Sequence, residues 1–318
     1  MEAAQKPVES ASSIDHTLSE VHSRGGITSH RTHSVYHLDR AQENSQVVAP
    51  SPFSPEGYSL FKHGDERWTR RYGHEVADWI LEAESELFDN ISSDEVLIAS
   101  FPDKYVPTAA TLMTEHAIMR LNHKLSSQRK PTVGCVQVFK YLWQASGEHY
   151  FAHMKEADRR RILDNVKLSV DERRLRDAHL IIVDDIRVTG ATEDKFLELL
   201  YRVDELRSLT VVYLAEVDPA IATVDPAIEG RLNQHKVKNI SDVAAIVATG
   251  EFQWNIRVAK FVLEADDLQE FSAFVDGLSN ELLLTFYKMT TLNDYHLEPN
   301  YARQFQVIHT AVEDRKLV

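Results

Sequence analysis

The chain has 318 residues and a mass of 36.3 kDa, which allows one large domain with appendages or two modest domains. Its hydrophobic content of 43% and charged content of 26% lie in the globular range, so we expect most of it to fold. The formal net charge of -14 argues against a general binder of nucleic acid or anionic membranes, because such proteins collect Lys and Arg. It does not exclude local binding of one phosphate by backbone amides.

Cys135 is the only cysteine, so neither an intrachain disulfide nor a thiolate-rich metal site can form, which suits a reducing cytoplasm. We interpret Cys135 itself as a small buried hydrophobic residue. The start of the chain, "MEAAQKPVESASS", lacks the basic and apolar regions of a signal peptide, and no uncharged run approaches the roughly 18 apolar residues of a membrane span. We therefore predict a cytoplasmic protein that binds neither nucleic acid nor membrane.

Residues 1–55 are predicted to form a flexible leader. This segment is rich in Ser, His, Gln and Pro and ends in "VVAPSPFSPEG". Within it His30, His33 and His37 are closely spaced, and a metal site is one interpretation of them. A polar tail is the interpretation we favour, because nothing in the sequence fixes the three imidazoles.

Order is predicted to begin near Tyr58, and from there strands alternate with helices. Apolar residues at spacings of three and four predict helices, and short apolar runs predict buried strands. The expected elements are a helix over 73–88, a strand over 95–100, a helix over 108–125, a strand over 132–141, a helix over 156–165, a strand over 178–185, a helix over 193–203 and a strand over 209–217. This alternation predicts an α/β fold with a doubly wound parallel sheet covered on both faces.

The chain is divided into three regions by this pattern. The leader covers 1–55, the α/β domain with an N-terminal hood segment covers 56–230, and a helical C-terminal extension covers 231–318. In the extension, one helix is expected to begin at an N-capping Ser241 and another near Asp266. We find no internal repeat.

The stretch "LIIVDDIRVTGAT" carries the clearest chemistry. Ligands of an open parallel sheet bind outside the carboxyl ends of its strands, where Asp184 and Asp185 are expected. Two adjacent carboxylates repel each other unless hydroxyls, amides or a cation stabilise them. In the following loop, Thr189, Gly190, Ala191 and Thr192 precede a helix, so backbone amides and two hydroxyls can converge on one anion. A ribose 5-phosphate, with vicinal hydroxyls and a phosphate, matches this layout.

The same stretch resembles the phosphoribosyl pyrophosphate (PRPP) signature of type I phosphoribosyltransferases: four apolar residues, two acidic residues and then T-G-small-T. The resemblance implies that Asp184 and Asp185 hold the ribose hydroxyls, directly or through magnesium-bound water. It implies that the segment from Arg187 and Val188 through Thr192 contacts substrate, with Thr189 to Thr192 cradling the 5-phosphate. The implied cofactor is magnesium, and the implied ligands are PRPP and a nitrogenous base or nucleoside monophosphate. We allow for a homodimer.

The family order of elements also fits residues 95–217. In that order "SFPDKY" stands in place of the pyrophosphate loop, and Lys104 would contact the leaving group. Lys140 ends the second strand, where the family often has a basic residue near pyrophosphate. The segment between Trp143 and Arg176 takes the place of a mobile hood. Aromatic residues that could stack on a base are Tyr58, Phe61, Trp68 and Trp143, although packing is the interpretation that we favour for each.

Three departures from the family pattern qualify the resemblance. The glycine-rich pyrophosphate loop of many members is absent, and Val188 stands where purine-salvage members often have an acidic residue that assists proton transfer. Arg187 is unusual in this loop and either pairs with Asp185 or contacts substrate. With its upstream "FKHGDERWTRRYG" and its helical extension, the chain resembles the divergent members found in bacterial stress-resistance and tellurium-resistance gene clusters.

The resemblance implies transfer of the 5-phosphoribosyl group between pyrophosphate and a nitrogenous base, in a direction that the sequence does not set. It requires no covalent protein nucleophile. Two alternatives stay open: a non-catalytic regulator that senses PRPP or a nucleotide, and a scaffold with a vestigial site. An aspartate-nucleophile phosphatase is excluded because Ile186 stands two positions after Asp184, and no P-loop motif is present.

Overall fold

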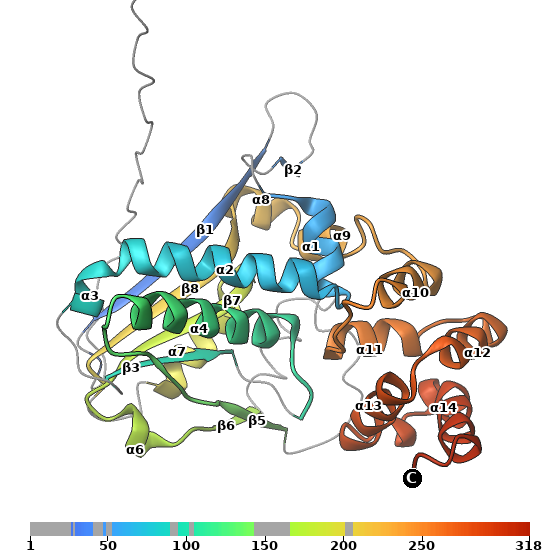
Figure 1. The fold of residues 1–318 in the computed structure, drawn as a ribbon. Helices are drawn as coiled ribbons and strands as arrows, with labels where there is room; N and C mark the ends of the chain where they lie inside the picture. The colour runs from blue at the N-terminus through green and yellow to red at the C-terminus, as the bar shows by residue number, and fades with distance from the viewer. Residues whose placement is uncertain are drawn as a thin grey trace, which may run out of the picture.

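The computed structural model describes residues 27, 29–40, 47–48, 53–89, 95–101, 105–142, 166–200 and 206–318. Its main sheet has six strands in the order β2-β1-β8-β7-β3-β4 (Figure 1). All neighbours pair in parallel except β1 and β2, which pair antiparallel. The strands are β1 (His30–Arg40), β2 (Val47–Val48), β3 (Val96–Ser100), β4 (Gly134–Cys135), β7 (His179–Arg187) and β8 (Ser208–Val217).

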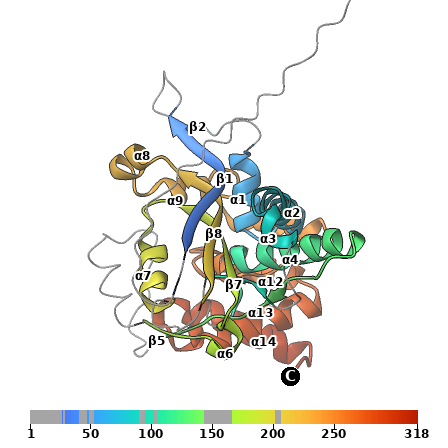
Figure 2. The ribbon, with the colours of Figure 1, turned by 90° about the vertical axis from the view of Figure 1, so that its left-hand side faces the viewer.

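Helices cover both faces of this sheet. The strands β3, β7 and β8 are rich in apolar residues and buried along most of their length, as expected for parallel strands that are covered on both sides. Figure 2 shows α7 on one side of the sheet and α2, α3 and α4 on the other. The helices of this part are α1 (Pro55–Lys62), α2 (Glu66–Ala83), α3 (Ser85–Asp89), α4 (Ala109–Ser127), α6 (Glu172–Leu175), α7 (Ala191–Leu200), α8 (Pro219–Val224) and α9 (Ile228–Asn233). The predicted doubly wound α/β fold is confirmed.

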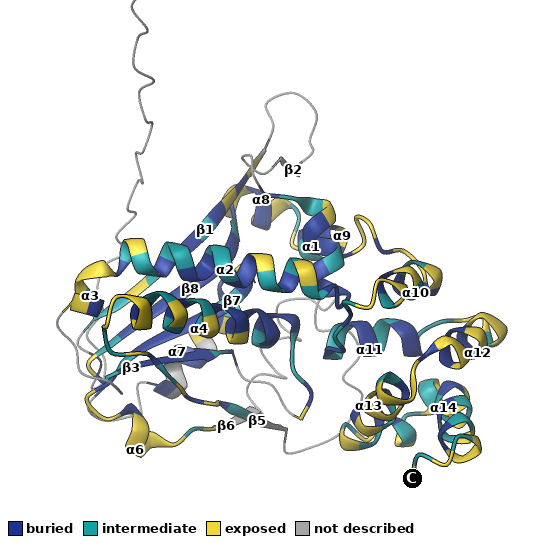
Figure 3. Cartoon of the chain, viewed as in Figure 1, coloured by how far each residue is buried: buried dark blue, intermediate teal, exposed yellow. Residues whose placement is uncertain are grey.

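Alternate residues of the strands pack into two different cores. On one face Ile181 and Val183 of β7 join a core with α2 and α4. On the other face Leu180 and Ile182 join a core with α7. Figure 3 shows these strands buried between the helices, whereas α6 is largely exposed. The period of two along β7 therefore fixes which side chains point to which layer.

The predicted flexible leader is wrong for residues 30–40. These residues form β1, which pairs in parallel with β8 from His30 opposite Leu209 to Leu38 opposite Val217. The strand also separates the three histidines that could have shared a metal ion. His30 lies beside Glu193, His33 packs on Trp79 with ring centroids 5.1 Å apart, and His37 lies near Ser34. Among the described residues, no group of three or more His, Cys, Asp or Glu side chains could hold a metal ion.

The single strand predicted over 132–141 is wrong, because the chain leaves the main sheet after two residues. Gly134 and Cys135 pair with β3 as β4, and β5 (Phe139–Leu142) then pairs antiparallel with β6 (Val166–Ser169) in a separate two-stranded sheet. Cys135 is exposed at the edge of the sheet, which corrects its predicted burial. The helix predicted over 156–165 lies outside the described residues.

The other predicted elements are confirmed with shifted ends. The helix predicted over 73–88 begins earlier, as α2 at Glu66, because Asp65 caps it by accepting hydrogen bonds from the amides of Arg67 and Trp68. A separate short helix, α1, precedes it and is capped by Ser54. The strand carrying the two aspartates runs on to Arg187, so the following loop is shorter than predicted.

Residues after Val237 form the predicted helical region, which has its own core. Its elements are α10 (Ile240–Ala248), α11 (Ile256–Leu263), α12 (Leu268–Gly277), α13 (Asn280–Leu292), the 3-10 turns η2 (Tyr295–Leu297) and η3 (Pro299–Tyr301), and α14 (Ala302–Asp314). The caps differ slightly from those predicted, because Asn239 and Asp267 cap α10 and α12 in place of Ser241 and Asp266.

Backbone hydrogen bonds join this helical region to the start of α2. The amide of Gln253 donates to the carbonyl of Gly64 at 2.9 Å, and the amide of Glu66 donates to the carbonyl of Glu251 at 3.0 Å. Leu60 of α1 packs against the helical core, and Val106 is part of it. In the part of the chain that the structure describes, no helix is long and apolar enough to cross a membrane.

Candidate functional site

The candidate site lies where β7 runs past the end of β3. Ser100, the last residue of β3, pairs with Val183, so Asp184 and Asp185 of β7 lie beyond the carboxyl end of β3. This is also the topological switch point. The chain passes from β3 through α4 to β4 on one side, and from β7 through α7 to β8 on the other. Ligands of doubly wound sheets bind at this position.

The two aspartates have different surroundings. Asp185 is 7% exposed, and its Oδ1 accepts a hydrogen bond from the amide of Ile186 at 2.8 Å. Burial, together with the neighbouring Asp185 carboxylate, raises the pKa of Asp184 well above its ordinary value. A ligand that brings hydroxyl donors or positive charge would therefore stabilise the ionised form of Asp184.

A lysine outside the predicted loop motif compensates the negative charge of Asp185. The ammonium of Lys62, at the end of α1, donates to Asp185 Oδ2 and lies 3.2 Å from Glu229 Oε1 on α9. Burial alone would lower the pKa of Lys62, but the Asp185 and Glu229 carboxylates raise it above its ordinary value. Lys62 is 123 residues from Asp185 in sequence, so no local motif joins them.

The loop after β7 has the geometry expected of an anion cradle. Gly190 has φ +76°, a left-handed conformation that favours glycine. α7 begins at Ala191, the next residue, so its first amides lie at the loop. Thr189 and Thr192 are exposed, and Thr189 Oγ1 accepts a long hydrogen bond of 3.5 Å from the Ala191 amide. Val188, by contrast, packs against the core shared with α2 and α4.

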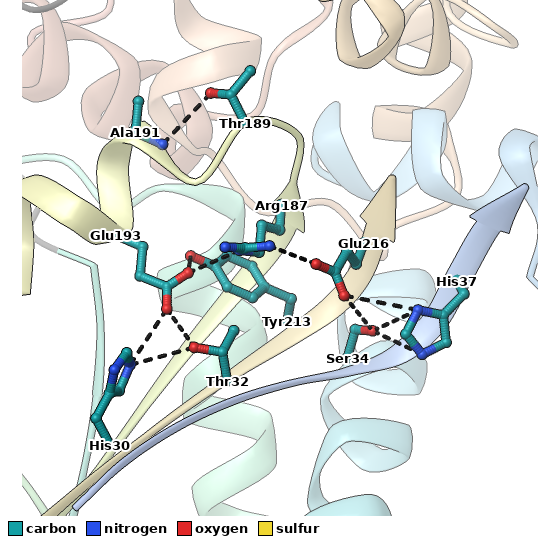
Figure 4. Close-up of polar contacts among 10 residues, drawn as sticks. All are labelled: His30, Thr32, Ser34, His37, Arg187, Thr189, Ala191, Glu193, Tyr213 and Glu216. Atoms are coloured by element: carbon teal, nitrogen blue, oxygen red, sulfur yellow. Dashed lines mark hydrogen bonds and ion pairs between the residues drawn. The ribbon is translucent and has the colours of Figure 1, made fainter. Parts of the chain in front are cut away.

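Arg187 does not pair with Asp185, which corrects that prediction. Its Nε donates to Glu193 Oε2 at 2.9 Å and its Nη1 donates to Glu216 Oε1 at 2.6 Å, as Figure 4 shows. The guanidinium also lies beside Gly190, because a Cβ on Gly190 would be 3.0 Å from Arg187 Nη2. Arg187 thus fixes the base of the loop against α7 and β8.

Glu193 is the centre of this second cluster. It is 3% exposed, and its carboxylate accepts hydrogen bonds from Thr32 on β1 and, at 3.3 Å, from the Tyr213 hydroxyl on β8 (Figure 4). His30 Nε2 lies 3.4 Å from Glu193 Oε1. Burial alone would raise the pKa of Glu193, but hydrogen bonds from His30 and Thr32, with the Arg187 guanidinium, hold it below the ordinary value. The first turn of α7 is therefore anchored to three strands.

A sequence profile of the family described as PRTase ComF-like matches residues 30–308. The match spans most of the chain, including β1 and most of the helical region. The chain belongs to this family. Its fold and membership confirm the predicted resemblance to type I phosphoribosyltransferases as a divergent member. No curated protein matches the sequence.

Solved structures of phosphoribosyltransferases are similar to part of this family member. A hypoxanthine phosphoribosyltransferase from Staphylococcus aureus has 13% identity and a TM-score of 0.29, over 46% of this chain and 64% of that one. A hypoxanthine-guanine phosphoribosyltransferase from Bacillus anthracis has 15% identity and a TM-score of 0.30, over 48% and 71%. A hypoxanthine phosphoribosyltransferase from Trypanosoma cruzi has 17% identity and a TM-score of 0.31, over 48% and 75%. The chain thus spans less than two thirds of the first of these proteins.

The remaining predicted residues of this phosphoribosyltransferase-like chain fall outside the described site. Lys104 lies outside the described residues, as does Trp143. Lys140 is in β5, where it pairs with Leu168, and its side chain is outside the description. Of the aromatic candidates, Tyr58 and Phe61 are fully buried, and Trp68 lies against Gly57. The packing interpretation of these three is confirmed.

Proposed function

We propose that this protein binds PRPP and transfers its 5-phosphoribosyl group between pyrophosphate and a nitrogenous base. The observation that supports this best is the segment from Asp184 to Thr192. It puts two carboxylates near the carboxyl end of β7, and then a left-handed glycine where α7 begins. Asp184 and Asp185 would accept the ribose hydroxyls. The amides and hydroxyls from Thr189 to Thr192 would donate to the 5-phosphate.

Magnesium fits this donor set as a metal that arrives with the substrate. Among the described residues, no protein cluster supplies three ligands, and one of the two aspartates already carries a lysine partner. Hard divalent cations of this kind take oxygen ligands from one or two carboxylates and from substrate phosphates. Asp184, with Asp185, would hold the ion directly or through water. Bound there, it would neutralise charge on the departing pyrophosphate.

The chain's own residues act in this reaction by positioning and by excluding water. The loop holds the phosphate and the aspartates hold the hydroxyls, so the anomeric carbon stays fixed relative to the incoming base. We propose that Lys104 and Lys140 contact the pyrophosphate, and that the segment between Trp143 and Arg176 covers it. Val188 packs into the core, so it brings no acid to the base. Proton transfer then depends on the base or on solvent.

A sensor that binds PRPP or a nucleotide without turnover is the second candidate. Two observations favour it. Asp185 already has a buried lysine partner, and the position that is acidic in purine-salvage enzymes is an apolar side chain packed in the core. A cytoplasmic location and a homodimer belong to our proposal and rest on the single cysteine and on the family resemblance. The finer resemblance to members of stress-resistance gene clusters stays a prediction.

Release of pyrophosphate separates enzyme from sensor. Purified protein would be incubated with PRPP, magnesium and a panel of purine and pyrimidine bases, with pyrophosphate followed by a coupled assay. Base-dependent release that is lost in Asp184→Asn supports the enzyme. Saturable PRPP binding without release, tested against every base, supports the sensor. If a folded protein neither binds PRPP nor releases pyrophosphate, both candidates are wrong.

A further inference from the structure

A buried ammonium group contacts the carboxylate pair from outside the loop motif. Lys62 is 9% exposed, and its Nζ lies between Asp185 Oδ2 and Glu229 Oε1. Its Nζ is also 5.6 Å from the centroid of the Tyr58 ring, one turn back on α1. A lysine this deep in the protein is uncommon unless it is paired. Here it is paired with one of the residues proposed to hold the ribose.

The surroundings of α1 hold Lys62 in place. Ser59 Oγ donates to the carbonyl of Asn233 at 2.6 Å and accepts from the amides of Lys236 and Val237 at 3.1 and 3.0 Å. The side-chain amide of Asn255, from the helical region, donates to the Lys62 carbonyl at 3.4 Å. The backbone that carries Lys62 is therefore fixed by α9 and α11. The ammonium does not have to be ordered when a ligand binds.

The hydrogen bonds of Asp185 leave lone pairs that could accept a ligand hydroxyl while Lys62 stays in contact. Lys62 uses Oδ2 and the Ile186 amide uses Oδ1, and each carboxylate oxygen has a second lone pair. A metal at such a pair would otherwise have two tasks: neutralising the buried charge and placing oxygen atoms for hydroxyl binding. Lys62 already performs the first.

We propose that Lys62 is the resident counter-cation of Asp185, so the ribose 5-phosphate part of the ligand binds without a divalent metal, which serves only the pyrophosphate part. This inference rests on the proposed function, and it makes Lys62 a positioning residue for the ribose. It applies to ligands with a ribose 5-phosphate and no pyrophosphate group, such as ribose 5-phosphate itself and nucleoside 5'-monophosphates.

The test is calorimetric titration of the full chain with ribose 5-phosphate, once in magnesium and once in chelator. For the wild type, we expect the two dissociation constants to agree within about twofold, because the metal has no charge left to compensate at Asp185. Binding that needs magnesium, or no binding in either buffer by a protein that binds PRPP with magnesium, would overturn the inference. Absence of PRPP binding with magnesium would instead count against the proposed function.

The variant Lys62→Met adds a readout that a merely structural role would not change. We expect it to lose at least about tenfold in affinity for ribose 5-phosphate in chelator, and to regain part of this in magnesium, because the metal then supplies the missing charge. An equal loss in both buffers would mean that Lys62 only supports the fold. Lys62→Arg should keep the metal independence, and a metal requirement in this variant would contradict the inference.

Two controls accompany this variant. Lys236→Met removes an exposed lysine paired with exposed Glu56, and it should change neither affinity nor its metal dependence. The double variant Lys62→Met/Asp185→Asn removes both charges. Its thermal unfolding should recover most of the stability that Lys62→Met loses, which would establish the ion pair independently of binding. If Lys62→Met does not fold, the wild-type comparison in the two buffers still decides the question.

Discussion

Two charged clusters flank the loop after β7, and each holds one cation between two carboxylates. Lys62 lies between Asp185 and Glu229, and Arg187 lies between Glu193 and Glu216. The Arg187 cluster is closed, because Thr32 and Tyr213 add donors to Glu193. The Lys62 cluster is open, because burial and the Asp185 carboxylate raise the pKa of the neighbouring Asp184 in spite of the Lys62 charge. The Arg187 cluster therefore shapes the loop, and the Lys62 cluster is left for a ligand.

The largest effect is expected when the closed cluster loses its cation. Arg187→Met would leave Glu193, which is 3% exposed, without its arginine partner. Breaking a buried pair on one side costs about 3–5 kcal/mol, so unfolding in urea should show a loss of that size. Arg71→Met is the matched control, because Arg71 is half exposed and pairs with Glu75 one turn along α2. It should lose less than about 1 kcal/mol. Equal losses would contradict a structural role for the closed cluster.

A smaller effect is expected on acidification at the open cluster. His63, next to Lys62, is fully buried, and its Nδ1–H donates to the Ser59 carbonyl at 2.8 Å. Burial lowers its pKa to about 4, below the ordinary value of 6.5. Between pH 6.5 and pH 4, the unfolded chain therefore binds a proton at His63 that the folded chain does not bind. Stability should fall as the pH falls from 6.5 toward 4, by about 2 kcal/mol at pH 5.

Urea unfolding at pH 7 and pH 5 measures this dependence. His63→Gln should lose less stability between the two pH values than the wild type, because no buried imidazole resists protonation. His235→Gln removes an exposed histidine and should keep the wild-type difference. If His63→Gln and His235→Gln have the same pH dependence, the buried imidazole is not the cause.

The smallest effect concerns the contact between Arg187 and the loop. In Gly190→Ala, the alanine must adopt a φ of +76°, and its Cβ lies 3.0 Å from the Arg187 guanidinium. Gly250→Ala has the same φ, but nothing lies within 4 Å of its Cβ. Both should lose about 1 kcal/mol from backbone strain. Only Gly190→Ala should also weaken PRPP binding, because the loop must shift. Similar binding by both variants would show that the loop tolerates displacement.

Much of the α/β core could be predicted from the sequence, because its central strands carry short, mostly apolar runs. "LIIV" before the aspartates and "LTVVYLAEV" are buried on both faces, and that burial makes the pattern local and strong. β1 could not be found in this way. His30, Thr32 and Ser34 make its sequence polar, and their partners are Glu193 and Glu216, which lie on distant elements.

The candidate site also contains residues that the sequence predicted and residues that it did not. The residues from Asp184 to Thr192 are contiguous, so one motif predicted both their place and their chemistry. Lys62 reaches Asp185 from α1, and Glu229 on α9 contacts Lys62, but nothing near either residue in sequence marks these contacts. Glu193 directly follows the motif, and an acidic residue in the first turn of α7 could have been selected as a helix-dipole partner. The burial of Glu193 under β1 could not have been predicted, because the strand β1 was not predicted from the sequence.

The most direct test of these two roles compares one carboxylate from each cluster. PRPP would be titrated with magnesium into Asp184→Asn and Glu193→Gln, with urea unfolding measured for both. We expect Asp184→Asn to keep its stability and to lose at least about tenfold in affinity, because this carboxylate is the one proposed to accept a ribose hydroxyl. We expect Glu193→Gln to lose stability and, where folded, to lose less PRPP affinity than Asp184→Asn does. The opposite result, with binding kept by Asp184→Asn and lost by a folded Glu193→Gln, would contradict these roles.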